Sequence, residues 1–408
     1  MPRSGGRGSL AGLVDFPKGA SVSRAFSGVR VLDLTHVLAG PFAAYQLGVL
    51  GADVIKIEPP DRPDFVRGRG PDPELNRQLR GINYQVQGGG KRAMTLDLRT
   101  SGGREVFRAL VRTADVVVEN YRAGALDRLG VGYEDLSAIN PELIHCSMTG
   151  YGRSGPRAEV NAYDNVVQAA SGVIARCDGH KPNLAFIDYG SGYNAAFAIA
   201  AALYARTRDG RGQRIDCAMF DTALMLMGPA VSAQLHPGVR EEPVQESGLG
   251  AYETADGVFV LGTPTPDQNR RLWSALATEG HPHPRFEALS TLDELREHSD
   301  AMRDALREIF RTQSAAWWEE WIHRRGLPGE RVRTLAEAVD EEQLKHRPFL
   351  QPAQDGDPPV PVAAFGFAHD GPSRDRPAPG FGEHTVEILQ ELGLSPADID
   401  DLRAEGAI

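Results

Sequence analysis

Short apolar runs alternate with segments of helical spacing over the first half of the chain. The runs lie at residues 29–34, 52–58, 94–98, 114–120, 143–148 and 215–218. Such runs are typical of strands buried on both faces of a sheet. Helical spacing follows the first run at 41–47 and the third at 101–113. Strands that alternate with helices predict β-α-β units, a parallel sheet and an α/β fold with a Rossmann-like core.

The longest apolar segment lies at residues 193–208 and is apolar nearly all round. A helix with this pattern is expected to be buried. Arg206 and Arg208 in its last turn, followed by Gly210, predict its C-terminus.

After residue 228 the pattern changes. Residues 252–261 predict a hairpin that turns at Asp256-Gly257, and residues 266–325 are mostly helical. We expect a large domain at 28–228 and a smaller α+β domain at 229–340. The remaining residues, 341–408, form a Pro- and Gly-rich linker and a C-terminal part with a final helix. Residues 1–27 are expected to be a flexible N-terminal extension, because Gly, Ser and Arg dominate them.

Composition and charge exclude several classes of protein. The 408 residues contain 41% hydrophobic residues and carry a net charge of −11. An acidic chain does not hold nucleic acid by bulk electrostatics, and no apolar stretch is long enough to span a membrane. Three cysteines without a CxxC pair are typical of neither a disulfide scaffold nor a zinc site, and we expect no metal site and a cytoplasmic location.

Three features are candidates for chemistry: the run at residues 88–92, Asp164 and Asp188. The run Gly88-Gly89-Gly90-Lys91-Arg92 brings glycines and two cations together, which suits either a phosphate site or a flexible loop. Asp164 starts a predicted helix and is expected to cap it. Asp188 lies before the long apolar helix among glycines. It either caps that helix, or is a functional carboxylate that the helix N-terminus keeps ionised while Gly190 and Gly192 let a ligand approach.

Several longer motifs resemble one enzyme family. Residues 31–41 (VLDLTHVLAGP) and 51–58 (GADVIKIE) are similar to the opening of the class III CoA-transferases, the formyl-CoA transferase and CaiB–BaiF family, which also includes alpha-methylacyl-CoA racemase. Further similar segments lie at 96–98, 118–122, 124–130, 163–172, 210–213 and 382–385. The resemblance therefore covers nearly everything after Gly28.

The resemblance implies a two-domain chain, a large domain built from both ends of the sequence, and an interlocked homodimer. It implies that Asp188 is the catalytic nucleophile. It places the CoA contacts on Val37, Leu38, Ala39, Leu96, Asp97, Leu98, Arg99, Asn120, Tyr121, Arg122, Arg128, Tyr163 and Asp164, to which the basic pair Lys91 and Arg92 is added for the CoA phosphates.

The implied activity is transfer of CoA from an acyl-CoA, with succinyl-CoA favoured as donor, to a free carboxylic acid. The aspartate would pass through an anhydride and an aspartyl-CoA thioester, with N–H groups around Gly190–Gly192 stabilising the oxyanions. The CoA thioester is a substrate, and no permanently bound cofactor is expected. An acyl-CoA racemase is the alternative, although Tyr163 replaces the histidine of racemases. A non-catalytic acyl-CoA-binding protein is a third possibility, which the presence of Asp188 disfavours.

Overall fold

The computed structural model describes residues 24–238, 246–347, 349–352 and 359–408. The chain divides into two compact units, one formed by residues 1–228 with 348–408 and the other by residues 229–347. Most of the extension predicted at 1–27 lies outside the described residues. Residues 24–27, however, are part of the fold, because the Phe26 N–H donates to Leu50 O at 2.9 Å and Phe26 packs against the core.

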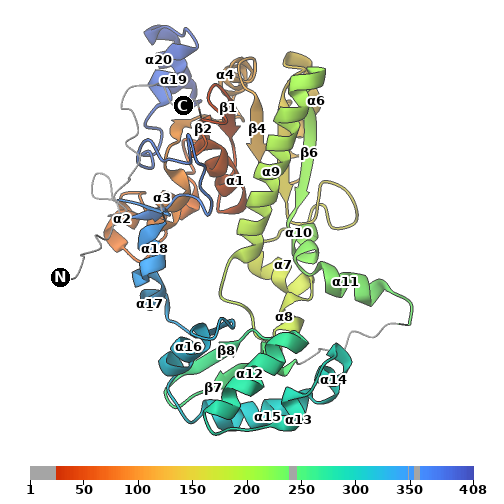
Figure 1. The fold of residues 1–408 in the computed structure, drawn as a ribbon. Coiled ribbons are helices and arrows are strands. Elements are labelled where there is room, and N and C mark those ends of the chain that lie inside the picture. Colours follow the sequence, from red (N-terminus) through yellow and green to blue (C-terminus); the bar gives the residue numbers. More distant parts are fainter. Residues whose placement is uncertain (1–23, 239–245, 348, 353–358) are drawn as a thin grey trace, which may run out of the picture. The chain divides into compact units, whose positions relative to one another are not determined.

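The larger unit is built on a six-stranded parallel sheet (Figure 1). The strands are β1 (Arg30–Asp33), β2 (Asp53–Glu58), β3 (Arg92–Thr95), β4 (Val116–Glu119), β5 (Ile144–Thr149) and β6 (Gln213–Ala218). Their order in the sheet is β3-β2-β1-β4-β5-β6. This is the doubly wound order, in which the direction of winding reverses between β1 and β4. The predicted α/β fold class with a Rossmann-like sheet is confirmed.

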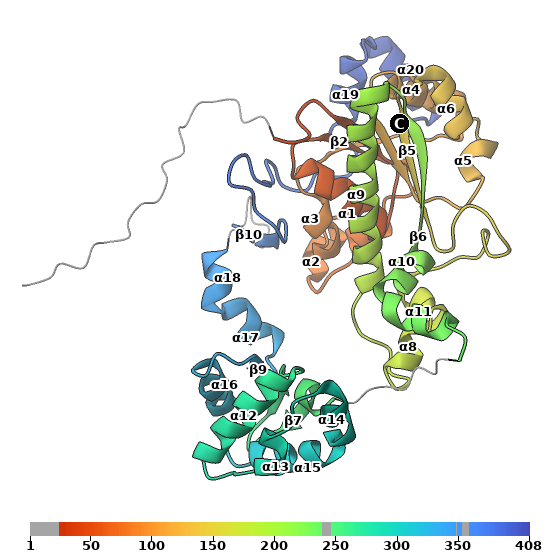
Figure 2. The same ribbon diagram turned by 45° about the vertical axis from the view of Figure 1, so that its right-hand side comes forward.

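Helices cover both faces of the sheet (Figure 2). On one face, Val31, Val54 and Val116 pack against helices α1 (Ala39–Gly48) and α9 (Phe186–Asp209). On the other face, the neighbouring strand residues Leu32 and Ile55 pack against a second group of helices. This group consists of α4 (Ser101–Val111), α6 (Tyr133–Ile139), α19 (Thr385–Glu391) and α20 (Pro396–Glu405).

Shorter elements complete this unit. They are η1 (Phe65–Gly68), α2 (Pro73–Arg77), α3 (Ile82–Gly88), α5 (Ala125–Arg128), α7 (Asp164–Ala170), α8 (Val173–Arg176) and α10 (Met219–Leu226), with β10 (Leu350–Gln351) and β11 (Val360–Pro361) in the C-terminal return. Along the return, Ser373 N–H donates to Val49 O at 2.9 Å, which fastens this irregular segment to the end of α1.

Helix α9 differs from its prediction in two ways. It begins seven residues earlier than the expected start at 193, at Phe186, so that Asp188 and its glycines are inside the helix. It is also not buried all round: Phe197 is 77% exposed and Tyr204 is 67% exposed. The apolar pattern marks one face that packs on α1 and the sheet, and a second face that no described residue covers.

The smaller unit has its own sheet and core. Its sheet contains β7 (Ala251–Glu253), β8 (Val258–Leu261) and β9 (Gly329–Arg331), and the first two form the predicted hairpin. Its helices are α11 (Gly228–Leu235), α12 (Pro266–Thr278), α13 (Pro284–Glu287), α14 (Leu292–Glu297), α15 (Ser299–Phe310), α16 (Ala315–His323), α17 (Leu335–Asp340) and α18 (Glu342–His346), and η2 spans Ser247–Leu249. Trp273, Trp318 and Trp321 fill the core between sheet and helices.

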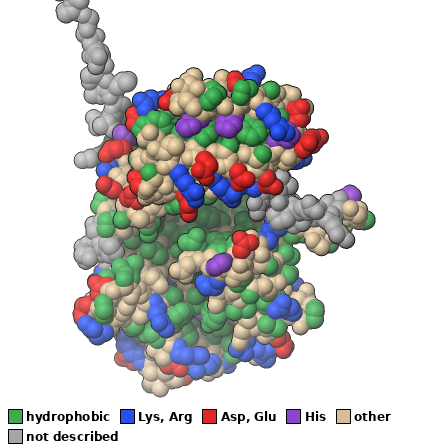
Figure 3. Space-filling model, turned by 90° about the horizontal axis from the view of Figure 1, so that it is seen from below, with side chains coloured by type: hydrophobic (Ala, Val, Ile, Leu, Met, Phe, Trp, Pro, Cys, Tyr) green, Lys and Arg blue, Asp and Glu red, His purple; other side chains and the backbone are tan. Residues whose placement is uncertain are grey.

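The face of the molecule seen in Figure 3 is not a basic one. Lys and Arg side chains are interspersed with Asp and Glu side chains over the face shown in Figure 3. No helix in the described ranges is both long enough and apolar enough to cross a lipid bilayer.

Candidate active site

A cavity of about 620 Å³ opens where the sheet changes its direction of winding. Its walls include Thr35 and His36 after β1, Asn120 and Tyr121 after β4, and the backbone at the start of α1. In doubly wound sheets, ligands bind outside the carboxyl ends of the strands at this point. The position follows from the topology, because the loops after β1 and β4 leave the sheet toward opposite faces.

Asp188 lies in the wall of this cavity, in the first turn of α9. The side chain is largely buried, and its carboxylate accepts no hydrogen bond from any described residue. Helix α9 is therefore not capped by Asp188, contrary to the structural alternative for this residue. A carboxylate in a cavity wall that has no hydrogen-bond partner among the described residues is available to a ligand that binds in the cavity.

Asp164 performs the capping instead, from the start of α7. One of its oxygens accepts the N–H groups of Ile187 at 2.9 Å and of Asp188 at 3.0 Å. Its other oxygen accepts a hydrogen bond from the Gln168 side chain. The prediction that Asp164 caps its own helix is wrong, because Tyr163 is the cap residue of α7 and Asp164 is 7% exposed and directed at α9.

The environment of Asp188 raises the pKa of its carboxyl group, contrary to the prediction that the helix N-terminus keeps it ionised. Burial and, after it, the negative charge of Asp164 raise the pKa of Asp188 from 3.8 to about 7. The helix N-terminus was expected to keep Asp188 ionised, but its Ile187 and Asp188 N–H groups are bonded to Asp164. Asp188 therefore combines a free carboxylate with unusually high basicity.

Gly192 has a role in helix packing. A Cβ atom at Gly192 would lie 2.8 Å from Ala39 O and 2.8 Å from Phe42 Cδ1, both on α1. Glycine thus lets α9 and α1 approach each other. The predicted oxyanion site is corrected for the same reason: the N–H groups of residues 190–192 lie inside α9, where they donate along the helix.

The loop after β1 is fixed to the loop after β4. The Asn120 side chain accepts the His36 N–H at 3.0 Å and donates to His36 O at 2.8 Å. Tyr121 N–H donates to the buried Glu119 at 2.7 Å. Burial raises the pKa of Glu119, while its hydrogen bond from Ser147 opposes the rise. The two Asn120–His36 hydrogen bonds fix the distance between the loops after β1 and β4, which form two walls of the cavity.

Comparison with known proteins identifies the family. The model of CoA-transferase family III matches residues 26–385. The chain belongs to CoA-transferase family III.

Named relatives agree with this result. The chain is 33% identical over 388 residues to the acetyl-CoA:oxalate CoA-transferase of Acetobacter aceti, covering 91% of this chain and 97% of that one. It is 33% identical over 392 residues to the succinate–glutarate CoA-transferase of Agrobacterium fabrum, covering 90% and 95%. A solved CaiB/BaiF family protein from Brucella suis shares the fold with a TM-score of 0.75 and 30% identity, covering 91% of this chain and all of that one.

Many of the CoA contacts that the family resemblance implies meet at the cavity. Its lining contains Val37, Leu38, Ala39, Asn120, Tyr121, Arg122, Arg128, Tyr163 and Asp188. Arg122 and Arg128 are exposed there, and neither has an ion-pair partner within the described part of the chain. Two guanidinium groups without ion-pair partners among the described residues are chemically suited to bind phosphate groups.

The other implied contacts, which include Asp164, are not among the residues that line the cavity. Lys91 is 1% exposed and pairs with Asp33 at 2.8 Å, and Arg92 pairs with Asp53, Glu387 and Glu391. Both charges are paired with carboxylates inside the fold, so these two side chains are not free cations, and a phosphate site at this run stays a prediction. Leu96 and Leu98 belong to the core, while Asp97 and Arg99 pair with each other at 2.6 Å. Strand β3 ends at Thr95, earlier than predicted, which leaves 96–99 in a turn before α4.

Sequence reasoning missed several residues of the site. Arg62, Asp64 and His36 line the cavity, and each belongs to a segment without regular spacing. A weak signal was present for Arg62, since a cation between Pro60 and Pro63 lies in a rigid loop after β2. Met148 and Met219 also line it, at the ends of β5 and β6.

Proposed function

We propose that this class III CoA-transferase moves CoA from an acyl-CoA to a free carboxylic acid and that Asp188 is its nucleophile. The observation that carries the proposal is the free Asp188 carboxylate in the cavity wall, at the start of α9. Its pKa of about 7 makes it more nucleophilic than an exposed aspartate once it is ionised.

The reaction divides into balanced exchanges. Asp188 attacks the thioester carbonyl, which forms an acyl-aspartyl anhydride and releases CoA thiolate. The thiolate attacks the aspartyl carbonyl, so that aspartyl-CoA thioester forms and the first acid leaves as its carboxylate. The second acid then attacks this thioester, and the same two steps in reverse give the new acyl-CoA and restore Asp188.

Replacing Asp188 tests the proposal. Asp188→Ala is expected to lower transfer by about three orders of magnitude or more, the scale of loss when a covalent nucleophile is removed. Wild-type protein mixed with acyl-CoA and hydroxylamine should carry a hydroxamate on Asp188, detected by peptide mass spectrometry. Full transfer by the folded alanine variant would show that another group reacts.

The substrates are proposed as succinyl-CoA and a dicarboxylic acid. The succinate–glutarate enzyme among the relatives supports this choice, while the acetyl-CoA:oxalate enzyme indicates a second donor to include. A panel of acyl-CoA donors and free acids, analysed by mass spectrometry, decides between them. Solvent deuterium at the α carbon of the acyl-CoA would instead indicate a racemase, and binding without exchange would indicate a binding protein.

The active form is proposed to be an interlocked homodimer located in the cytoplasm. The exposed apolar side chains of α9 and α10 support a partner: Phe197, Tyr204 and Met225 are each at least 67% exposed. Isolated exposed apolar residues are common, but several on two adjoining helices suggest a contact surface. The C-terminal return from the smaller unit to the larger one provides the connection that interlocking requires.

A further inference from the structure

The backbone at Val37 adopts a conformation that its side chain disfavours. Its φ is +75°, in the left-handed region. For a β-branched residue this is a rare and strained conformation. Val37 lines the cavity between the end of β1 and the start of α1, and Leu38 and Ala39 after it do so as well. Strain of this kind persists where the surroundings determine the backbone, and it is concentrated at functional sites.

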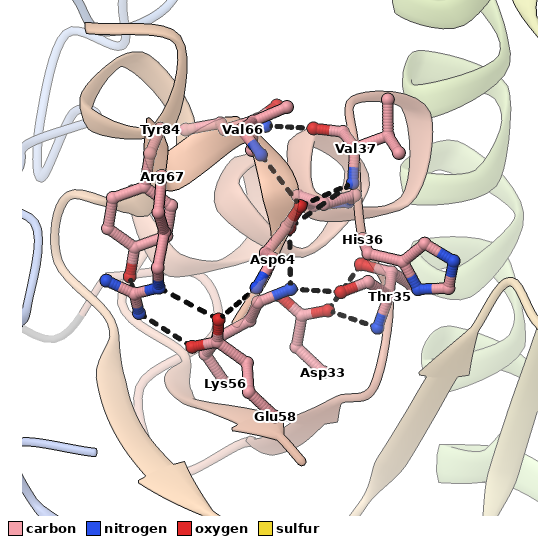
Figure 4. Close-up of polar contacts among 12 residues, drawn as sticks. Asp33, Thr35, His36, Val37, Lys56, Glu58, Asp64, Val66, Arg67 and Tyr84 are labelled. Carbon is pink, nitrogen blue, oxygen red and sulfur yellow. Dashed lines mark hydrogen bonds and ion pairs between the residues drawn. The ribbon is translucent and has the colours of Figure 1, made fainter. Parts of the chain in front are cut away.

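Two side chains hold the strained residue from both sides. The Val37 N–H donates to both carboxylate oxygens of Asp64, at 3.1 and 3.2 Å. The Val37 carbonyl accepts a hydrogen bond from the Gln87 side chain on α3. Figure 4 shows the Asp64 carboxylate directed at the Val37 nitrogen. Both peptide groups that flank the Val37 Cα are thus fixed by groups distant in sequence.

Asp64 is itself held in place by buried partners. It accepts hydrogen bonds from Lys56 at 3.3 Å and from Val66 N–H at 3.3 Å, and its own N–H donates to Glu58 at 2.9 Å. Glu58 is held in turn by Arg67, through contacts of 2.8 and 2.6 Å. Buried ion pairs of this kind add little net stability, because removing charges from water costs free energy. Their consequence here is a fixed position for the Asp64 carboxylate.

We propose that Asp64 and Gln87 are positioning residues that keep Val37 in its left-handed conformation, so that the backbone of residues 37–39 is already shaped for CoA before CoA arrives. The inference rests on the proposed function in one respect, that the cavity is the CoA site. Preformed binding groups raise affinity because the ligand does not have to order them. The binding of CoA itself is therefore the property to measure.

Asp64 and Gln87 together are called the clamp on Val37. Gln87→Met removes one of its two sides, the hydrogen bond to the Val37 carbonyl, with the least disturbance of the surrounding fold. Methionine has a similar size. The Gln87 side-chain oxygen is buried and has no partner in the described part of the chain, so the exchange also removes an unsatisfied polar atom. Asp64→Asn is less suitable, because it leaves Lys56 buried without its charge partner. For Gln87→Met we expect the Kd of CoA, measured by calorimetry, to rise about tenfold, with the thermal unfolding temperature nearly unchanged.

A rescue experiment separates positioning from general damage. Glycine adopts left-handed backbone without strain, so Val37→Gly makes the clamp unnecessary. In the double variant Gln87→Met/Val37→Gly, we expect the Kd of CoA to return to within about twofold of the Val37→Gly value. If the effects of the two substitutions on the Kd of CoA multiply instead, the proposal is wrong. It is also wrong if Gln87→Met binds CoA with the Kd of the wild type.

Gln46→Met is the matched control. Gln46 is another buried glutamine, 4% exposed, whose two polar side-chain atoms have no hydrogen-bond partner among the described residues. Its exchange should leave the Kd of CoA unchanged, and an equal rise would overturn the positioning role of Gln87. Because calorimetry needs no turnover, an enzyme that binds CoA but transfers it to no acid would contradict the proposed function and leave the clamp to be judged by its own variants.

Discussion

Asp188 and Asp164 carry the same functional group in two different environments. Asp164 is fully engaged, with two backbone N–H groups on one oxygen and Gln168 on the other. The Asp188 carboxylate has no hydrogen-bond partner among the described residues, and Asp188 lines the cavity. In the proposed mechanism, Asp164 organises the start of α9 and Asp188 reacts, so two neighbouring carboxylates have different roles.

This arrangement predicts a pH dependence. In the proposed mechanism the ionised form of Asp188 is the nucleophile, and the pKa of its carboxyl group is raised to about 7. We therefore expect kcat/KM for acyl-CoA to rise with pH through about 7 and then to level off. Asp164→Asn retains an oxygen that can accept the N–H groups of α9 but removes a negative charge, so the rise should move to lower pH. A pH–rate profile that stays in place, or moves to higher pH, would contradict the coupling.

Arg122 and Arg128, which line the cavity without an ion-pair partner among the described residues, provide a second prediction. Arg128→Ala should raise the KM for acyl-CoA about tenfold, because a guanidinium–phosphate pair contributes on the order of 1–2 kcal/mol, and should leave the KM for the free acid nearly unchanged. Arg112→Ala is the control, since Arg112 is exposed and lies outside the cavity. Equal increases in both KM values would remove Arg128 from the CoA site.

At the residue scale, the partners of charged side chains are difficult to predict from sequence. Lys91 and Arg92 follow three glycines and have the composition of a phosphate site, but their partners Asp33 and Asp53 lie 58 and 39 residues earlier in the chain. Neither pairing leaves a local signal. The same is true of Asp164, whose capping target is 23 and 24 residues away.

At the scale of elements, the strands were accessible from sequence and the start of α9 was not. Strands buried on both faces leave continuous apolar runs, and all six runs correspond to strands of the sheet. Helix α9 begins at Phe186, but Gly190 and Gly192 are poor helix formers and hide that start. Glycine is needed at position 192 because α1 packs closely there, and this tertiary contact cannot be read from the local sequence.

The packing of α9 on α1 leads to a stability prediction with an internal control. Gly192→Ala should lower the free energy of unfolding by about 1–3 kcal/mol, because its Cβ would contact Ala39 and Phe42 on α1. Gly190→Ala, in the same helix, places its Cβ 3.3 Å from Thr222 Cγ2 and should be neutral or slightly stabilising. Urea unfolding of both variants measures the difference, and equal effects would show that helix propensity alone governs these sites.

At the scale of the whole molecule, the strand order determines where the site lies. The sequence predicts a parallel sheet, and the order of its strands came from the three-dimensional structure. Once β1 and β4 are neighbours, the loops that carry His36 and Asn120 must meet, and the cavity lies between them. The strained Val37 could not be foreseen, because its cause is the joint action of Asp64 and Gln87.

The proposed interlocked homodimer makes a prediction about exchange. Chains threaded through each other cannot separate without unfolding, so dilution to nanomolar concentration should leave the dimer intact. Tagged and untagged protein should form no mixed dimers in native buffer over a day. The same mixture, unfolded in urea and refolded, should form them and serves as the positive control. A monomer by light scattering, or mixing within minutes, would refute interlocking.

The C-terminal helices α19 and α20 have a consequence for synthesis on the ribosome. Ile388, Leu389 and Leu402 cover the same sheet face as Leu32 and Ile55, and Ala407 O accepts the Asp97 N–H at 2.7 Å. At about 5–20 residues per second, these helices are made roughly 15–60 s after β3. During that interval the nascent sheet exposes an apolar face, which a chaperone is suited to bind. A nonsense mutation even twenty codons from the end would leave this face open and direct the product toward proteolysis.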